Sequence, residues 1–235
     1  MKDTIILSIE TAEEGCSAAL GIGGRLYGSK GISTPRAQAA QLAVLVDDLF
    51  KSAGIAPSEC DAVAVSSGPG SYTGLRVGVS TAKGLCFGLS KPLIAVSTLD
   101  LLMETGREYS EYESDTDFII PMIDARRMEV YSAVYDASGK ELEAPQAVIL
   151  EPDSFTNYLD RGKVIFNGSG ARKFKEIQHH PNALFLPTQP DAVYMVKLAE
   201  AAFNKGKFAD TAYFEPFYLK NFTPGISKKN ILSKE

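Results

Sequence analysis

Cysteine and histidine are scarce in this sequence, and their scarcity limits the sites that the chain can form. The three cysteines, Cys16, Cys60 and Cys86, make no Cys-x-x-Cys pair and are odd in number. This pattern indicates neither a zinc site nor a disulfide framework, and free cysteines fit a reducing cytoplasm. The two histidines, His179 and His180, are adjacent in a polar segment, where we expect a surface loop rather than a metal site.

Long apolar runs and a secretion signal are also missing. No apolar stretch reaches the ~18 residues that a membrane-spanning helix requires. The first residues, Met1 to Asp3, lead directly into a strand-like segment, with no hydrophobic signal region or cleavage site. We therefore expect a cytoplasmic chain that does not enter a membrane.

Basic residues do not dominate the composition, which is otherwise ordinary for a globular protein. The 24 basic and 29 acidic residues give a net charge of −5. Proteins that bind RNA alone usually present a basic face, because neutralising phosphates supplies much of the affinity. The one dense basic stretch, Lys228, Lys229 and Lys234, is best interpreted as a solvated chain end. The charge therefore argues against stand-alone RNA binding.

The first half of the chain predicts the element order β-β-β-α-β-α. Runs of β-branched residues indicate strands, Gly23-Gly24 a hairpin turn, and Thr34-Pro35 the start of a helix. The expected elements are strands at Thr4–Ile9, Cys16–Ile22 and Arg25–Gly31, a helix to Ala53, a strand at Asp61–Ser66 and a helix ending near Gly88.

A similar order returns after Ser97. We expect strands at Phe118–Ile123, Glu129–Tyr135, Gln146–Leu150 and Val164–Asn167, and helices at Pro152–Leu159, Gly170–Ile177 and Ala192–Asn204. Two such halves, residues 1–100 and 101–235, suggest an α/β chain with the duplicated ribonuclease-H-like, actin-like (ASKHA) fold. The last helix would be free to pack back on the first half. Element order alone does not settle function.

The segment Ser66–Gly88 is the most unusual part of the sequence. Its loop, Gly68-Pro69-Gly70-Ser71, has either of two interpretations: a phosphate cradle at a helix N-terminus, or a tight strand-to-helix turn. The segment contains neither a Walker A motif nor a Gly-x-Gly-x-x-Gly fingerprint, so the turn is the stronger interpretation. A nucleotide contact would involve Gly68, Gly70, Ser71 and Thr73.

Small residues recur every fourth position in the helix that follows, at Gly74, Gly78 and Ala82. Glycine inside a helix costs ~1 kcal/mol relative to alanine, so close approach of another element must compensate. That element is either the sheet of the same domain or a helix of another chain. Spacing alone favours internal packing, with Leu75 and Val79 on a neighbouring apolar stripe.

Four motifs resemble the bacterial TsaB (YeaZ) family and follow one another in the family's order over nearly the whole chain. The segment SSGPGSYTGLRVGVSTAKGL is similar to the family's GPGSFTGLR signature, with Tyr72 at the aromatic position. The other three are Ile9-Glu10-Thr11, the run from Ile123 to Tyr131, and Pro216–Lys220.

The resemblance implies the duplicated actin-like fold and a role in a complex. TsaB-like proteins pair with a larger paralogue, TsaD, which holds the metal and the nucleotide (ATP or ADP). TsaD transfers a threonylcarbamoyl group to N6 of adenosine 37 in tRNAs that read codons beginning with A. TsaE joins the assembly, and isolated TsaB forms homodimers. The chain is therefore expected to be a non-catalytic subunit without its own cofactor, contacting tRNA indirectly.

The resemblance also places the TsaD contact on two helices, about Pro35–Ala53 and Thr73–Gly88. Replacing Gly78 by leucine is expected to weaken association while the monomer stays folded. The predicted interface residues are Leu42, Leu45, Leu49, Gly74, Leu75, Arg76, Gly78, Val79 and Ala82.

The residue inventory agrees with a non-catalytic subunit. The first helix, Arg36-Ala37-Gln38-Ala39-Ala40-Gln41, lacks the paired histidines that bind metal in TsaD-like proteins. Glu10 replaces the aspartate that positions the nucleotide in actin-like ATPases, and Ser66, Ser67 and Ser71 have no nearby histidine for peptidase chemistry.

Two alternatives to a subunit without nucleotide contacts stay open from the sequence. The chain could be an autonomous, sugar-kinase-like ATPase that uses Glu10, or it could touch a nucleotide at the junction with TsaD through the loop at Gly70. Asp124 is expected to hold a turn that carries Arg126 and Arg127, one of which could line the cleft between the halves.

Overall fold

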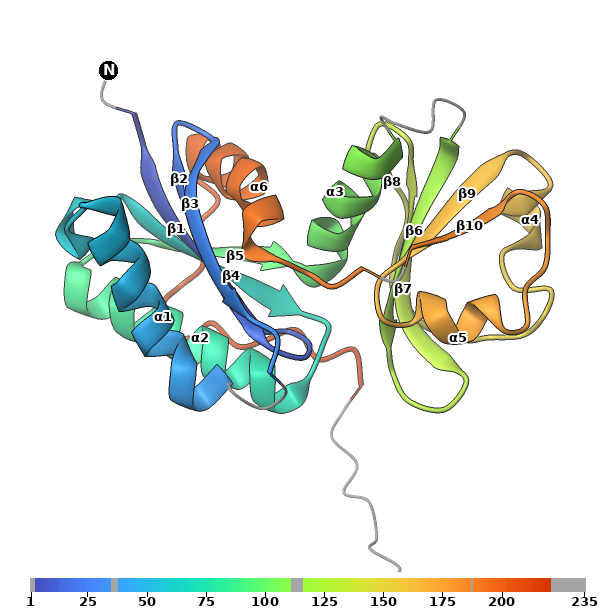
Figure 1. Ribbon diagram of the computed structural model, residues 1–235, viewed down its shortest axis with the longest axis horizontal. Coiled ribbons are helices and arrows are strands. Elements are labelled where there is room, and N and C mark those ends of the chain that lie inside the picture. The colour runs from blue at the N-terminus through green and yellow to red at the C-terminus, as the bar shows by residue number, and fades with distance from the viewer. Residues whose placement is uncertain (1–2, 35–37, 111–115, 187, 221–235) are drawn as a thin grey trace, which may run out of the picture.

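The computed structural model describes residues 3–34, 38–110, 116–186 and 188–220, and its first half is built on a five-stranded mixed sheet (Figure 1). The central strand is buried at every position because helices cover both faces of the sheet. The order is β3-β2-β1-β4-β5, with β1, β2 and β3 antiparallel and β4 and β5 parallel to β1. The strands are β1 (Ile5–Glu10), β2 (Cys16–Ile22), β3 (Arg25–Ile32), β4 (Ala62–Gly68) and β5 (Leu93–Ser97).

The second half repeats this topology strand for strand. Its order, β8-β7-β6-β9-β10, again places three antiparallel strands beside two parallel ones. The predicted duplicated ribonuclease-H-like, actin-like fold is thereby confirmed. The strands are β6 (Thr116–Asp124), β7 (Glu129–Asp136), β8 (Glu141–Ile149), β9 (Lys163–Asn167) and β10 (Ala183–Leu186).

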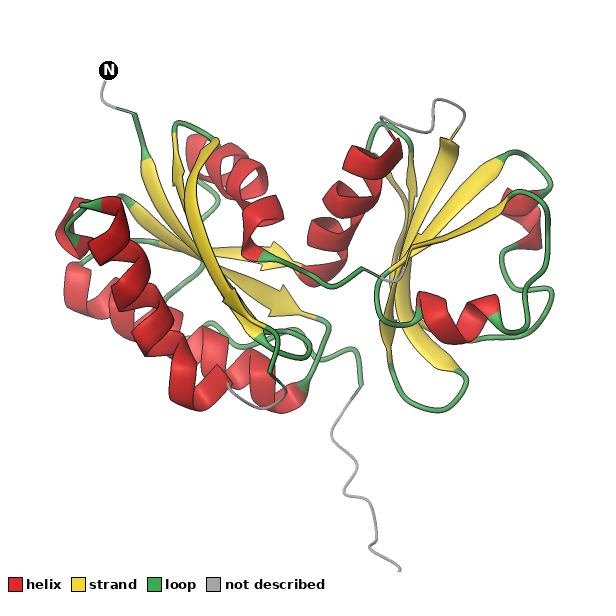
Figure 2. Cartoon of the chain, viewed as in Figure 1, coloured by secondary structure: helices red, strands yellow, loops and turns green. Residues whose placement is uncertain are grey.

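Helices cover the two faces of the first sheet separately (Figure 2). Side chains alternate along a strand, so Leu7 and Ile9 of β1 pack with α1 and α2, whereas Ile6 packs with α6. Figure 1 shows α3 between α6 and the second sheet. The helices are α1 (Gln38–Ala53), α2 (Tyr72–Leu89), α3 (Thr98–Ser110), α4 (Thr156–Leu159), α5 (Ala171–Lys175) and α6 (Ala192–Asn204), with a 3-10 turn at Pro57–Glu59.

After the second half, the chain returns to the first. The helix α6 packs on β1 and β2, and the Ala209 N–H then donates to the Leu93 carbonyl at 2.8 Å. Further on, the Phe217 N–H donates to the Ser67 carbonyl at 2.7 Å. Lys83 of α2 donates to the carbonyls of Ala212 (3.0 Å) and Phe214 (3.1 Å). The first half is therefore assembled from both ends of the described chain.

Several elements differ from the sequence expectations. The strands β5 and β10 and the helix α3 were not predicted, and α4 is one turn long because residues 152–155 form a turn. The strand β8 begins at Glu141 rather than at the predicted Gln146. Its exposed polar residues obscure the alternation of apolar and polar residues that would mark a strand in the sequence. The proposed helix start at Pro35 and the basic residues Lys228, Lys229 and Lys234 lie outside the described residues.

The glycine ridge of α2 is filled from within the chain. A Cβ on Gly74 would lie 2.1 Å from the Thr11 carbonyl oxygen, and one on Gly78 would lie 2.1 Å from Thr11 Oγ1. That hydroxyl donates to the Gly74 carbonyl at 2.8 Å. The glycines therefore let α2 lie directly against the end of β1, which is the internal-packing interpretation.

The predicted set of interface residues is also corrected by this packing. Eight of its nine residues are buried, because the apolar faces of both helices point toward the sheet. The substitution Gly78→Leu would therefore disturb folding before it tested association. The buried members are Leu42, Leu45, Leu49, Gly74, Leu75, Gly78, Val79 and Ala82; Arg76 is exposed.

Two alanine substitutions in α2 should have opposite effects on stability. Gly78→Ala should lower the free energy of unfolding by about 2 kcal/mol, because the new methyl group overlaps Thr11. Gly84→Ala should raise it by about 0.5–1 kcal/mol, because a Cβ there meets no atom within 4 Å and alanine favours the helix. Urea denaturation of both variants measures this, and equal effects would contradict the described packing.

Candidate functional site

A cleft opens beside the carboxyl end of β1. Its volume is about 350 Å³, and it is lined by the loop that follows β1, the end of β3 and the segment that precedes α6. Acidic side chains dominate its polar lining, with Glu10, Glu13, Glu14 and Asp191 contributing carboxylates. No described residue on this wall contributes a lysine or an arginine. The cleft is therefore suited to a cation or a proton rather than to an anion.

Glu10 is the most deeply buried carboxylate of the cleft. Its side chain is 2% exposed, on the face of β1 opposite to Leu7 and Ile9. Oε1 accepts the Ala12 N–H, whereas Oε2 has no hydrogen-bond partner among the described residues. Burial away from water raises the pKa of Glu10 to about 7, and the hydrogen bond from Ala12 opposes part of that shift.

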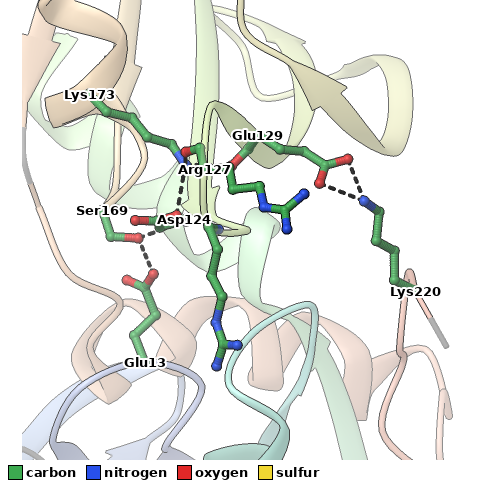
Figure 3. A network of polar contacts seen from close by, with 8 residues as sticks. Glu13, Asp124, Arg127, Glu129, Ser169, Lys173 and Lys220 are labelled. Carbon is green, nitrogen blue, oxygen red and sulfur yellow. Dashed lines mark hydrogen bonds and ion pairs between the residues drawn. The ribbon is translucent and has the colours of Figure 1, made fainter. Parts of the chain in front are cut away.

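Glu13 connects the two halves of the molecule. Its Oε1 accepts a hydrogen bond from the hydroxyl of Ser169, which lies before α5 in the second half (Figure 3). Burial is the main reason that the pKa of Glu13 rises to about 7; the Ser169 hydrogen bond lowers it and the charge of Glu10 raises it. The contact between the halves therefore includes a carboxyl group that titrates near neutral pH.

The Gly-rich loop does not form an open phosphate cradle. A Cβ on Gly68 would lie 2.5 Å from the Phe217 carbonyl oxygen, and one on Gly70 would lie 2.4 Å from the Ala12 carbonyl oxygen. The Ser71 N–H donates to Ala12, and Ser71 Oγ caps α2 by accepting from Gly74 N. Other chain segments therefore pack directly against both glycines, which fits the tight-turn interpretation. Thr73 is exposed on α2.

The turn between β6 and β7 has an unusual backbone. Arg126 and Arg127 both have positive φ angles, 69° and 51°. Asp124 Oδ1 accepts from the Arg126 N–H at 2.6 Å, which is the expected Asx-type contact. The Asp124 N–H donates to Ser169 Oγ, so the turn and Glu13 share one partner (Figure 3).

The other predicted residues lie apart from this cleft. Arg76 donates to Tyr72 Oη at 2.8 Å, and the Tyr72 ring lies 5.1 Å from the Tyr218 ring, so the signature helix and the terminal motif touch. His180 lies near Asp160 in the second half, remote in the chain from the serines of the Gly-rich segment. Ser66 is buried and Ser67 donates to the Val96 carbonyl.

Sequence reasoning missed Glu13, Ser169 and Asp191. No motif marks them, because two halves of the fold bring them together from positions far apart in the chain. Within the described ranges, no three His, Cys, Asp or Glu side chains form a group that could hold a metal ion. The described helices include none that is both long and apolar enough to cross a bilayer.

The pKa shifts predict a pH-dependent stability. Both carboxyls have folded pKa values of about 7 against 4.5, so the folded state binds protons more tightly than the unfolded chain. Their contribution is full below about pH 4.5 and is lost as the pH rises through 7. In the unaltered chain, the free energy of unfolding should fall between pH 5 and pH 8. Glu10→Gln should make this fall smaller by about 2 kcal/mol.

Urea denaturation at pH 5 and pH 8 measures this difference. The matched control is Glu151→Gln, which makes the same chemical change at an exposed position outside the cleft. An unaltered pH dependence in Glu10→Gln would show that Glu10 is not the titrating group.

Comparison with known proteins agrees with the fold and the sequence motifs. The family model described as TsaD, tRNA N6-adenosine threonylcarbamoyltransferase, matches residues 32–227. The tRNA threonylcarbamoyladenosine biosynthesis protein TsaB of Escherichia coli (strain K12) is 30% identical over 241 residues, covering 98% of this chain and 99% of that protein. The structure of YeaZ from Pseudomonas aeruginosa superposes with a TM-score of 0.78 at 32% identity, covering 92% of this chain and 100% of that one.

A transferase is similar over a shorter region. The tRNA N6-adenosine threonylcarbamoyltransferase of Jannaschia sp. (strain CCS1) is 50% identical over 64 residues, which are 27% of this chain and 18% of that protein.

Proposed function

We propose a subunit role for this chain, because it belongs to the TsaB (YeaZ) family of tRNA threonylcarbamoyladenosine biosynthesis proteins. In this proposal the chain is non-catalytic and activates a TsaD-type transferase by forming a heterodimer with it. The transferase supplies the nucleotide and metal, a TsaE-type protein joins the larger assembly, and tRNA is reached through the complex. The isolated chain would cover the same surface by forming a homodimer.

The observation that carries the proposal is the outer face of α2. Ser80, Gly84 and Gly88 follow one another at four-residue spacing on its exposed side, and Phe87 beside them is 87% exposed. A Cβ on either glycine would meet no atom within 4 Å. This row of small residues would admit another helix at close range, and a partner would bury the Phe87 ring. These residues replace the buried ones in the predicted interface.

The neighbouring helix extends the same surface. The exposed side of α1 carries Ala40, Ala43 and Val44, and Val44 is 54% exposed. Figure 1 shows α1 and α2 side by side on the outside of the first half, facing away from the second. A partner docked on this outer-helix surface would leave the cleft at Glu10 accessible.

Two features support a subunit without nucleotide chemistry of its own. The Gly-rich loop packs tightly against Ala12 and Phe217, as expected for a strand-to-helix turn. Glu10 stands where actin-like ATPases use a shorter aspartate, and its side chain is 2% exposed, with Oε1 accepting the Ala12 N–H.

Substitutions on the outer-helix surface should weaken pairing without unfolding the chain. Phe87→Ala should weaken binding to a TsaD-type partner about 30-fold, as expected for a buried aromatic anchor. Gly84→Leu should do so by keeping the partner helix away. Isothermal titration calorimetry measures both affinities. Ile149→Ala, which removes a 67% exposed side chain from the second half, is the matched control. Wild-type affinity in both α2 variants would contradict this interface.

Reconstitution tests the activity itself. Modification of a tRNA that reads codons beginning with A should require this chain together with the TsaD- and TsaE-type proteins and threonylcarbamoyl-adenylate. The purified chain alone should not turn over ATP. Mg²⁺-dependent ATP hydrolysis that is lost in Glu10→Ala would instead favour the autonomous ATPase.

A further inference from the structure

The turn between β6 and β7 presents two arginines that the rest of the chain does not neutralise. Arg126 and Arg127 are both exposed, and neither guanidinium forms a hydrogen bond or an ion pair with any described residue. The two nearby carboxylates are already paired. Asp124 accepts from Lys173 at 2.7 Å, and Glu129 accepts from Lys220 at 2.5 Å. Two positive charges therefore stay unpaired at the tip of this turn.

The backbone of the turn disfavours these residues. Both have φ in the left-handed region, where glycine or asparagine is usual and other residues cost roughly 1–2 kcal/mol each. Strain of this kind is concentrated at sites that hold side chains for binding. The arginines are thus displayed by a conformation that is intrinsically unfavourable for them.

A lysine from another element holds the turn in place. Lys173 of α5 uses all three of its donors here, bonding to Asp124 Oδ1, the Arg127 carbonyl (2.7 Å) and the Glu129 carbonyl (2.6 Å). Ser169 bonds to the Asp124 N–H and connects the turn to Glu13 in the first half (Figure 3). The two guanidiniums therefore project from a turn that is held by hydrogen bonds from α5 and, through Ser169, from the first half.

We propose that Arg126 and Arg127 bind the phosphate backbone of the RNA substrate within the complex. The inference rests on the proposed function, which brings tRNA to this chain. Guanidinium groups bind phosphate through two parallel hydrogen bonds, and phosphate contacts orient an RNA without reading its sequence. Because the chain carries a net charge of −5, this contact orients tRNA held mainly by the partner.

The test uses the complex of the full chain with a TsaD-type partner, titrated with an unmodified tRNA transcript at several salt concentrations. The variant Arg126→Gly with Arg127→Gly removes both guanidiniums and relieves the backbone, so it should be at least as stable as the unaltered chain. Its tRNA affinity should be roughly tenfold lower, and the slope of log K against log salt should be less steep by about 1.5.

Two further variants separate the possible causes. Lys205→Ala with Lys207→Ala also removes two exposed positive charges, after α6. This variant should keep its tRNA affinity within twofold of the unaltered chain and should keep the same salt slope. Arg126→Lys with Arg127→Lys should keep the salt slope but lose part of the affinity, because lysine cannot form the two parallel hydrogen bonds.

Pairing is measured by sedimentation before RNA is added. If the unaltered chain does not pair, the proposed function fails and this inference fails with it. If the glycine variant loses pairing, the turn contacts an acidic surface of the partner, which overturns the RNA assignment. If pairing is kept and tRNA binding is unchanged, the inference alone is overturned.

Discussion

The contact between α2 and Thr11 is the constraint on which the rest of the first half depends. Because Gly74 and Gly78 have no side chains, the helix lies directly against the residue that follows β1. The same approach brings Ala12 against Gly70 and closes the Gly-rich loop. It also directs the opposite side of α2, with Gly84 and Phe87, toward solvent. One close contact thus packs the Gly-rich loop tightly and leaves the opposite side of α2 exposed as a potential docking surface.

The second constraint is the burial of acidic groups where the halves meet. Glu10 and Glu13 lie in a cleft whose described lining supplies no basic side chain, so desolvation raises their pKa values instead of being offset by ion pairing. Ser169 then links Glu13 to the turn that carries the two arginines. Hydrogen bonds through Ser169 therefore connect the acidic cleft to the basic turn. The cleft favours positively charged ligands, whereas the turn favours negatively charged ones.

These features divide the chain into surfaces with separate proposed tasks. The outer-helix surface is apolar and contains small residues, which suits a protein partner. The turn at Arg126 and Arg127 carries unpaired positive charge, which suits phosphate. The two surfaces belong to different halves of the fold, since α2 covers the first sheet and the turn joins β6 to β7 of the second. In the proposed assembly, these two surfaces would let the chain contact a protein and an RNA at the same time.

The sequence by itself determined the fold class and the family, because the strand patterns and four motifs are local properties of the chain. It also predicted the close packing of the glycine ridge, since the spacing of Gly74 and Gly78 leaves no other compensation for their helix cost. Only the tertiary structure decided which side of α2 is free, because helical spacing defines a stripe but not the element that covers it. It alone brought Glu13 to Ser169 and left the arginines unpaired, since such contacts join residues that no local pattern connects.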